Sequence, residues 1–133
     1  MNASIQPARR QSLAGARLRR HSDYARAYAA GRKYRSASMS WLLAPREGTQ
    51  RVGLTVPKPV GKAHERNRIK RRMREALRRH VELLPPGCDL IFHPRRIVLT
   101  LEFSKLEAEI VRILQQANTE AARTAVAGKR DGS

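Results

Sequence analysis

The sequence contains almost no cysteine. Cys88 is the only one in 133 residues, so the chain can form neither an intrachain disulfide nor a zinc site built from cysteines. We expect Cys88 to be a small, buried hydrophobic residue.

Long apolar segments are also missing. No run is long enough to cross a bilayer, and we find no separate amphipathic anchor outside the expected folded region. The first 20 residues lack the apolar core of a secretory signal, so Arg9-Arg10 does not by itself make a twin-arginine signal. We therefore expect a cytoplasmic protein that does not bind membranes.

Acidic residues are scarce. Eleven Asp and Glu stand against 28 Lys and Arg, which gives a formal net charge of +17. So many positive side chains repel one another unless a polyanion neutralises them, and nucleic acid is therefore the leading class of partner.

The same scarcity argues against an autonomous nuclease, which needs convergent carboxylates for metal ions or a histidine acid–base pair. His64-Glu65 begins like the zinc-protease motif HExxH, but position 68 is Arg instead of His. We predict no catalytic residue and no metal ligand in the polypeptide.

The length suits one domain with loose ends. Residues 1–16 and 119–133 are polar and lack a hydrophobic period, so we expect a disordered basic tail, a domain over residues 17–118 and a second disordered tail.

Hydrophobic periodicity predicts helices at about 22–30, at 63–84 and from 104, and strands at 37–44, 51–56 and 89–92. Pro45 and Gly48 favour a turn that makes the first two strands antiparallel neighbours. Residues 97–101 fit either another strand or an extended connector. Trp41, on the first strand, is expected in the core.

The long helix carries an unusual charge pattern. Residues 58–80 contain ten Lys or Arg and only two acidic residues, Glu65 and Glu75. At 100 degrees per residue, the face opposite the apolar stripe carries Asn67, Arg71, Arg74 and Arg78, with Arg68, Arg72 and Arg79 in a second row. A helix face that is merely solvated usually alternates Glu with Lys and Arg, so this density of cations favours phosphate as the partner.

The same region resembles the bacterial ribonuclease P protein family. Arg66-Asn67-Arg68 matches the RNR motif of that family, and the similarity also includes residues 51–56, 61–71 and Arg74-Glu75. The resemblance implies an α/β (α+β) fold, a two-layer sandwich of a roughly four-stranded sheet and three helices. It further implies a left-handed βαβ crossover that includes the RNR helix.

By this resemblance, the chain is the protein subunit of ribonuclease P, a ribonucleoprotein endoribonuclease (a hydrolase) that removes the 5′ leader from precursor tRNA. Catalysis is expected from the RNA subunit with Mg²⁺, and the polypeptide alone is expected to be inactive. The implied partners are the ribonuclease P RNA and precursor tRNA, not DNA. The expected RNA-binding residues are Lys58, Lys62, Arg66, Asn67, Arg68, Lys70, Arg71 and Arg74.

Tyr24 and Tyr28 fall where the family usually has two phenylalanines, in a cleft that takes the single-stranded leader. Their rings can stack on an unpaired base or pack in the core, and the sequence leaves both open. Lys58-Pro59 replaces a pair of lysines common in the family, which puts one leader contact in doubt.

A ribosomal or other structural RNA-binding protein is the main alternative, because that class shares the charge, the size and the α/β composition. The RNR block favours ribonuclease P.

Overall fold

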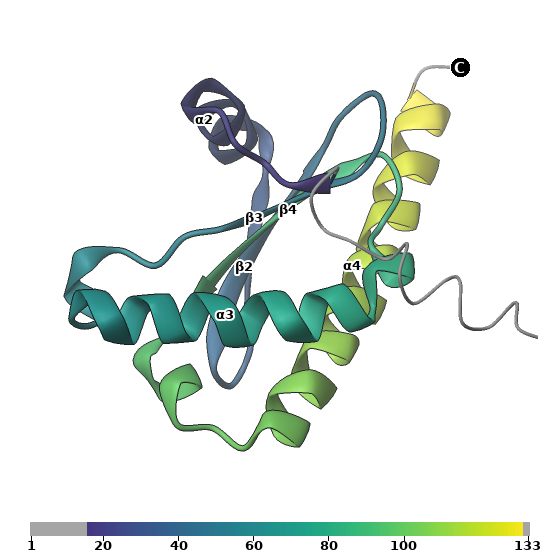
Figure 1. Ribbon diagram of the computed structural model, residues 1–133. Coiled ribbons are helices and arrows are strands. Elements are labelled where there is room, and N and C mark those ends of the chain that lie inside the picture. The colour runs from purple at the N-terminus through teal and green to yellow at the C-terminus, as the bar shows by residue number, and fades with distance from the viewer. Residues whose placement is uncertain (1–15, 132–133) are drawn as a thin grey trace, which may run out of the picture.

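A computed structural model describes residues 16–131 of the chain, with side chains to residue 124. The expected N-terminal tail lies outside the described residues, apart from Ala16. The elements, in chain order, are α2 (His21–Ala30), β1 (Arg32–Arg35), β2 (Met39–Pro45), β3 (Arg51–Leu54), η3 (Lys58–Val60), α3 (Ala63–Arg79), η4 (Val81–Leu83), β4 (Cys88–Pro94), η5 (Arg96–Leu99) and α4 (Phe103–Asp131), where η marks a short 3-10 helix (Figure 1).

The four strands form one mixed sheet in the order β1-β2-β4-β3. β1 and β4 each pair antiparallel with β2, whereas β3 and β4 are parallel neighbours joined through α3. The α+β fold and the parallel crossover through the long helix are as the resemblance implies.

The sequence predicted a hairpin of neighbouring strands on either side of the Pro45 turn, and this prediction is wrong. β4 lies between β2 and β3, because it is buried at every position except His93 and therefore belongs at the centre of the sheet. The turn after Pro45 reverses the chain, with Gly48 at φ 108°, but it does not make its flanking strands neighbours. β1 is an additional edge strand, whose sequence Arg-Lys-Tyr-Arg carries no apolar alternation.

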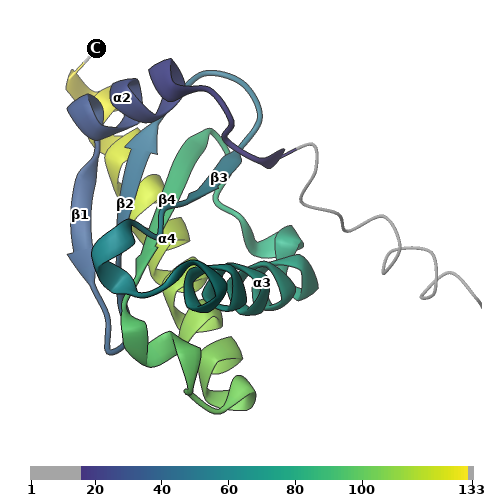
Figure 2. The same cartoon turned by 60° about the vertical axis from the view of Figure 1, so that its left-hand side comes forward.

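The two faces of the sheet are covered differently (Figures 1 and 2). One face packs against α3 and α4 around the fully buried Trp41 and Phe92, which confirms the core position expected for Trp41. The other face is covered by α2, through Ala27 against Leu42 and Ile91. This second cluster is small, so α2 covers only part of its face.

Helix α4 extends to Asp131 and so includes most of the range expected to be a disordered tail. Ala117 is buried, Ala121 packs against the main core, and the Asn118 side-chain amide donates to the carbonyl oxygen of Leu83 at 2.7 Å. These contacts, with the high helix propensity of alanine, continue the helix past residue 118.

Three other features refine the sequence interpretation. The long helix ends at Arg79 and is followed by η4, while residues 96–99 form η5 with Val98 buried, neither a strand nor an extended connector. Cys88 is buried, as expected. Within residues 16–131, none of the helices has the length and apolarity that a membrane span needs.

Candidate nucleic-acid interface

Helix α3 presents a cationic face to solvent. Its buried residues are Ile69, Met73, Ala76 and Leu77, which fix the opposite side outward. On that side Asn67, Arg68 and Arg71 are exposed and Arg74 is partly exposed. Arg66 and Lys70 lie at the edge of the buried side and are also partly exposed. Lys58 and Lys62, just before the helix, are exposed as well. The RNA-binding residues expected from the sequence therefore lie along one helix and the turn that leads into it.

The second row of arginines is largely engaged within the protein. Arg72 donates to the carbonyl oxygen of Leu101 and lies 6.0 Å from the centroid of the Phe103 ring, and burial lowers its pKa. Arg79 lies 4.9 Å from the same centroid and pairs with Glu75 at 3.0 Å. These two arginines hold α3 against the start of α4.

Arg78 also belongs to this engaged group, because it pairs with Glu75 at 2.8 Å. By contrast, the side chains of Arg68, Lys70 and Arg71 form no hydrogen bond or ion pair with any other described residue. The charges left for an external anion are therefore concentrated in the first half of α3.

The start of α3 is fixed by Glu65. Its carboxylate accepts a hydrogen bond from the Lys62 backbone N–H at 2.9 Å and two from the Arg96 guanidinium at 2.8 and 2.7 Å. The Arg66 side chain donates to the Gly61 carbonyl oxygen at 3.1 Å, so the first arginine of the RNR motif also supports this turn. Hydrogen bonding from Arg96, followed by that from Lys62, lowers the pKa of Glu65 to about 2.

Replacing Glu65 with glutamine is expected to remove a pH-dependent contribution to folding. Because the folded-state pKa is lowered from 4.5 to about 2, the contribution is complete above about pH 4.5 and is lost as the pH falls toward 2. The difference in unfolding free energy between wild type and Glu65→Gln should be constant near neutral pH and shrink through this acidic window, as measured by denaturant titration at a series of pH values. A difference that does not change with pH would show that the carboxylate is not held as described.

The two tyrosines of α2 occupy different environments. Tyr24 is half-buried, and its hydroxyl accepts from the Leu54 N–H at 3.3 Å and lies 3.5 Å from the Leu18 carbonyl oxygen, to which it donates. Its ring covers Gly53, where a Cβ would lie 2.9 Å from the ring. Gly53 thus lets α2 approach the sheet closely, and Tyr24 is a packing residue.

The ring of Tyr28 is exposed to solvent. Its side chain is 41% exposed, and its hydroxyl lies 2.8 Å from Nε2 of His93, across the open part of the sheet. The centroids of these two rings are 5.7 Å apart. Burial, and then the charge of Lys33, lower the pKa of His93, which favours the neutral imidazole. Of the two alternatives that the sequence left open, Tyr24 fits packing and Tyr28 leaves a ring face available for stacking.

Replacing Tyr24 with phenylalanine is expected to reduce the unfolding free energy by about 0.5–1.5 kcal/mol, because the Leu54 N–H and Leu18 carbonyl lose their shared partner. Tyr28→Phe is the matched control, since among the described residues its hydroxyl hydrogen-bonds only to the His93 side chain, at a solvent-exposed position. Denaturant titration of both variants would compare them. Equal, negligible losses would mean that the Tyr24 hydroxyl does not support the α2–β3 contact.

A hollow of about 40 Å³ lies beside β3. Tyr24 from α2 and Arg74 from α3 both line it, together with Arg17. Burial and the charge of Arg17 lower the pKa of Arg74, so the two cations lie close together. Arg17, Lys33 and His93 were not among the predicted site residues. Lys33 pairs with Leu42 and therefore lies on the face of the sheet that α2 covers. The sequence alone does not give this strand pairing, so it could not place Lys33 near the tyrosines.

Comparison with known proteins gives a consistent result. A family model described as Ribonuclease P matches residues 14–118. A ribonuclease P protein component of Chloroflexus aggregans is 41% identical over 104 residues, covering 76% of this chain and 76% of the relative. One from Finegoldia magna is 30% identical over 104 residues, covering 78% of this chain and 92% of the relative.

Solved structures agree with the sequence matches. The RNase P protein of Thermotoga maritima superposes with a TM-score of 0.68 at 26% identity, covering 75% of this chain and 96% of that protein. The Staphylococcus aureus RNase P protein gives a TM-score of 0.67 at 24% identity, covering 77% and 94%, and so shares the fold.

Proposed function

Because this chain belongs to the ribonuclease P protein family, we propose that it binds the RNA subunit of ribonuclease P and the 5′ leader of precursor tRNA. In this role it promotes the endonucleolytic maturation of tRNA in the cytoplasm. The observation that carries the proposal is the group of cations on the outer face of α3 that have no partner among the residues that the structure describes.

Arg68 and Arg71 are the central residues of this surface. Both are exposed and have no partner among the other described residues, whereas Arg72 and Arg79 on the same helix are held by Phe103 and its neighbours. A free guanidinium can grip a phosphate through paired donors and stack on an exposed base. Lys58, Lys62, Arg66, Asn67, Lys70 and Arg74 extend the proposed RNA-binding surface along the helix and its leading turn.

The leader is assigned to the open part of the sheet beside α2. The exposed Tyr28 ring can stack on an unpaired base without selecting its identity, and Lys33 supplies a nearby positive charge. Tyr24 contributes by holding α2 on the sheet. Tyr24 and Arg74 line one hollow beside β3, which places the start of α2 near the middle of α3.

We assign the hydrolytic step to the RNA subunit with Mg²⁺. The assignment is supported by the way in which the acidic residues of the polypeptide are used: Glu65 is held by Arg96, Asp89 by Arg51 at 2.9 Å, and Glu109 by the Ser38 N–H at 2.8 Å. Across the described part of the chain, no three His, Cys, Asp or Glu side chains are grouped to hold a metal ion.

The bound RNA distinguishes this proposal from a ribosomal or other structural RNA-binding role. The full chain would be isolated from its own cells and the RNA that accompanies it sequenced. We expect one abundant structured RNA, with precursor tRNA as a minor component. Ribosomal RNA as the main component would contradict the proposed partner.

A further inference from the structure

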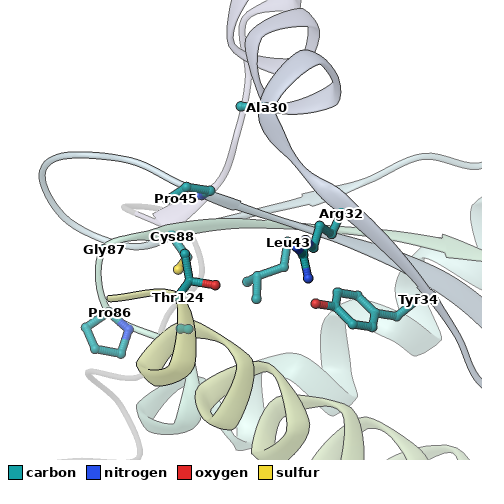
Figure 3. A pocket seen from close by; sticks show the side chains of 10 residues that line it. Ala30, Arg32, Tyr34, Leu43, Pro45, Pro86, Gly87, Cys88 and Thr124 are labelled. Atoms are coloured by element: carbon teal, nitrogen blue, oxygen red, sulfur yellow. The ribbon is translucent and has the colours of Figure 1, made fainter. Parts of the chain in front are cut away.

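A second hollow of this fold lies away from the cationic face of α3. A cavity of about 450 Å³ opens between the sheet and the C-terminal part of α4, beneath the turn that precedes β4 (Figure 3). Leu43, Pro45, Pro86 and Ala121 supply apolar walls. Among the described residues that line it, none belongs to α3.

Three polar side chains border this apolar space. Figure 3 shows the polar ends of Arg32, Tyr34 and Thr124 turned toward the cavity. The Tyr34 ring is held by stacking on Trp41, with ring centroids 4.3 Å apart. Within the described part of the chain, the Arg32 side chain forms no ion pair or hydrogen bond, and the hydroxyls of Tyr34 and Thr124 are likewise without a hydrogen bond.

We propose that this cavity binds a small amphipathic anion, with an apolar ring or short chain and one carboxylate or sulfonate group. Ligand pockets of roughly 300–1,000 Å³ typically combine apolar walls with a few polar groups that fix orientation. Here the apolar body would lie against Leu43, Pro86 and Ala121, and Arg32 would hold the anionic group, with the two hydroxyls as further donors. Among the described lining residues, apolar walls stand beside one guanidinium, that of Arg32. This lining favours such a molecule over a nucleotide, which carries more polar groups than these residues can satisfy.

Cys88 makes occupancy directly measurable. It lines the same cavity and is the only cysteine of the chain, so a thiol reagent reports on this site alone. The thiol is buried, and its reaction with 5,5′-dithiobis(2-nitrobenzoate) is expected to be slow and to become slower when the cavity is filled.

The charge requirement can be tested with two dyes of similar shape on the full chain. 8-Anilinonaphthalene-1-sulfonate carries the anionic group and N-phenyl-1-naphthylamine lacks it. We expect one sulfonate dye per chain, bound roughly tenfold or more weakly by Arg32→Gln, with little change for the uncharged dye. Arg35→Gln is the matched control, because it removes the same charge from the same strand but points to the opposite face of the sheet.

The location is tested by filling the space. Ala121→Trp should abolish binding of both dyes, and saturating sulfonate dye should protect Cys88 in the wild-type chain at least severalfold. The protection measurement needs no variant, so it decides the matter even if Ala121→Trp does not fold. Equal weakening by Arg32→Gln and Arg35→Gln, or unprotected Cys88 at dye saturation, would overturn the proposal by placing the dye on the cationic surface in general.

Discussion

Replacing both Arg68 and Arg71 with alanine is expected to weaken binding of the ribonuclease P RNA by about 10²–10⁴-fold. Both side chains are exposed on α3 and have no partner among the other described residues, so their whole hydrogen-bonding capacity is available to phosphate. A hydrogen bond to a charged group contributes about 1.5–3 kcal/mol, which gives the range for two residues. Each lost phosphate contact should also reduce the slope of log affinity against log salt by about 0.7–0.9.

Lys105→Ala with Arg112→Ala is the matched control. Both residues are exposed on α4, and their removal lowers the net charge equally. Filter binding at several salt concentrations should show the normal slope for this control and a reduced slope for the α3 pair. Identical slopes for both pairs would mean that the RNA responds only to total charge and does not contact Arg68 and Arg71.

Replacing Tyr28 with alanine is expected to weaken holoenzyme binding to precursor tRNA by about 1–3 kcal/mol, the value of one lost base–aromatic stack. Binding of mature tRNA should be almost unchanged, because it has no leader. Tyr28→Phe should retain most of the affinity, since it keeps the ring and loses only the hydrogen bond to His93.

Thermal unfolding of the same variants separates stacking from packing. The side chain of Tyr28 is 41% exposed, so its removal should change the melting temperature little. Equal losses for precursor and mature tRNA in a folded Tyr28→Ala variant would remove this ring from the leader site.

The surface of the long helix was largely predictable from the sequence, because three- and four-residue spacing of apolar side chains fixes which face turns outward. What the spacing could not show is which cations are already engaged. Arg71 and Arg72 are adjacent and chemically identical, yet only Arg72 contacts Phe103 and Leu101, some thirty positions further along the chain. Such partners follow from tertiary packing and leave no local pattern.

The order of the strands in the sheet also depends on contacts between residues far apart in the sequence, and it was not predictable for the same reason. The Pro45 to Gly48 turn indicates a chain reversal, but the insertion of β4 between its flanking strands depends on residues more than forty positions away. The handedness of the crossover likewise came only from the family resemblance. The different environments of Tyr24 and Tyr28 depend on Gly53 and His93, which lie on two other elements.

A reconstituted cleavage assay tests the central claim most directly. Precursor tRNA with a labelled 5′ leader would be incubated at physiological magnesium with the protein alone, with the cognate RNA subunit alone and with both. The account predicts no cleavage by the protein alone and release of the intact leader when RNA and protein are combined, at a rate above that of the RNA alone. Leader removal by protein freed of RNA, or a protein that leaves the rate of the RNA unchanged, would contradict it.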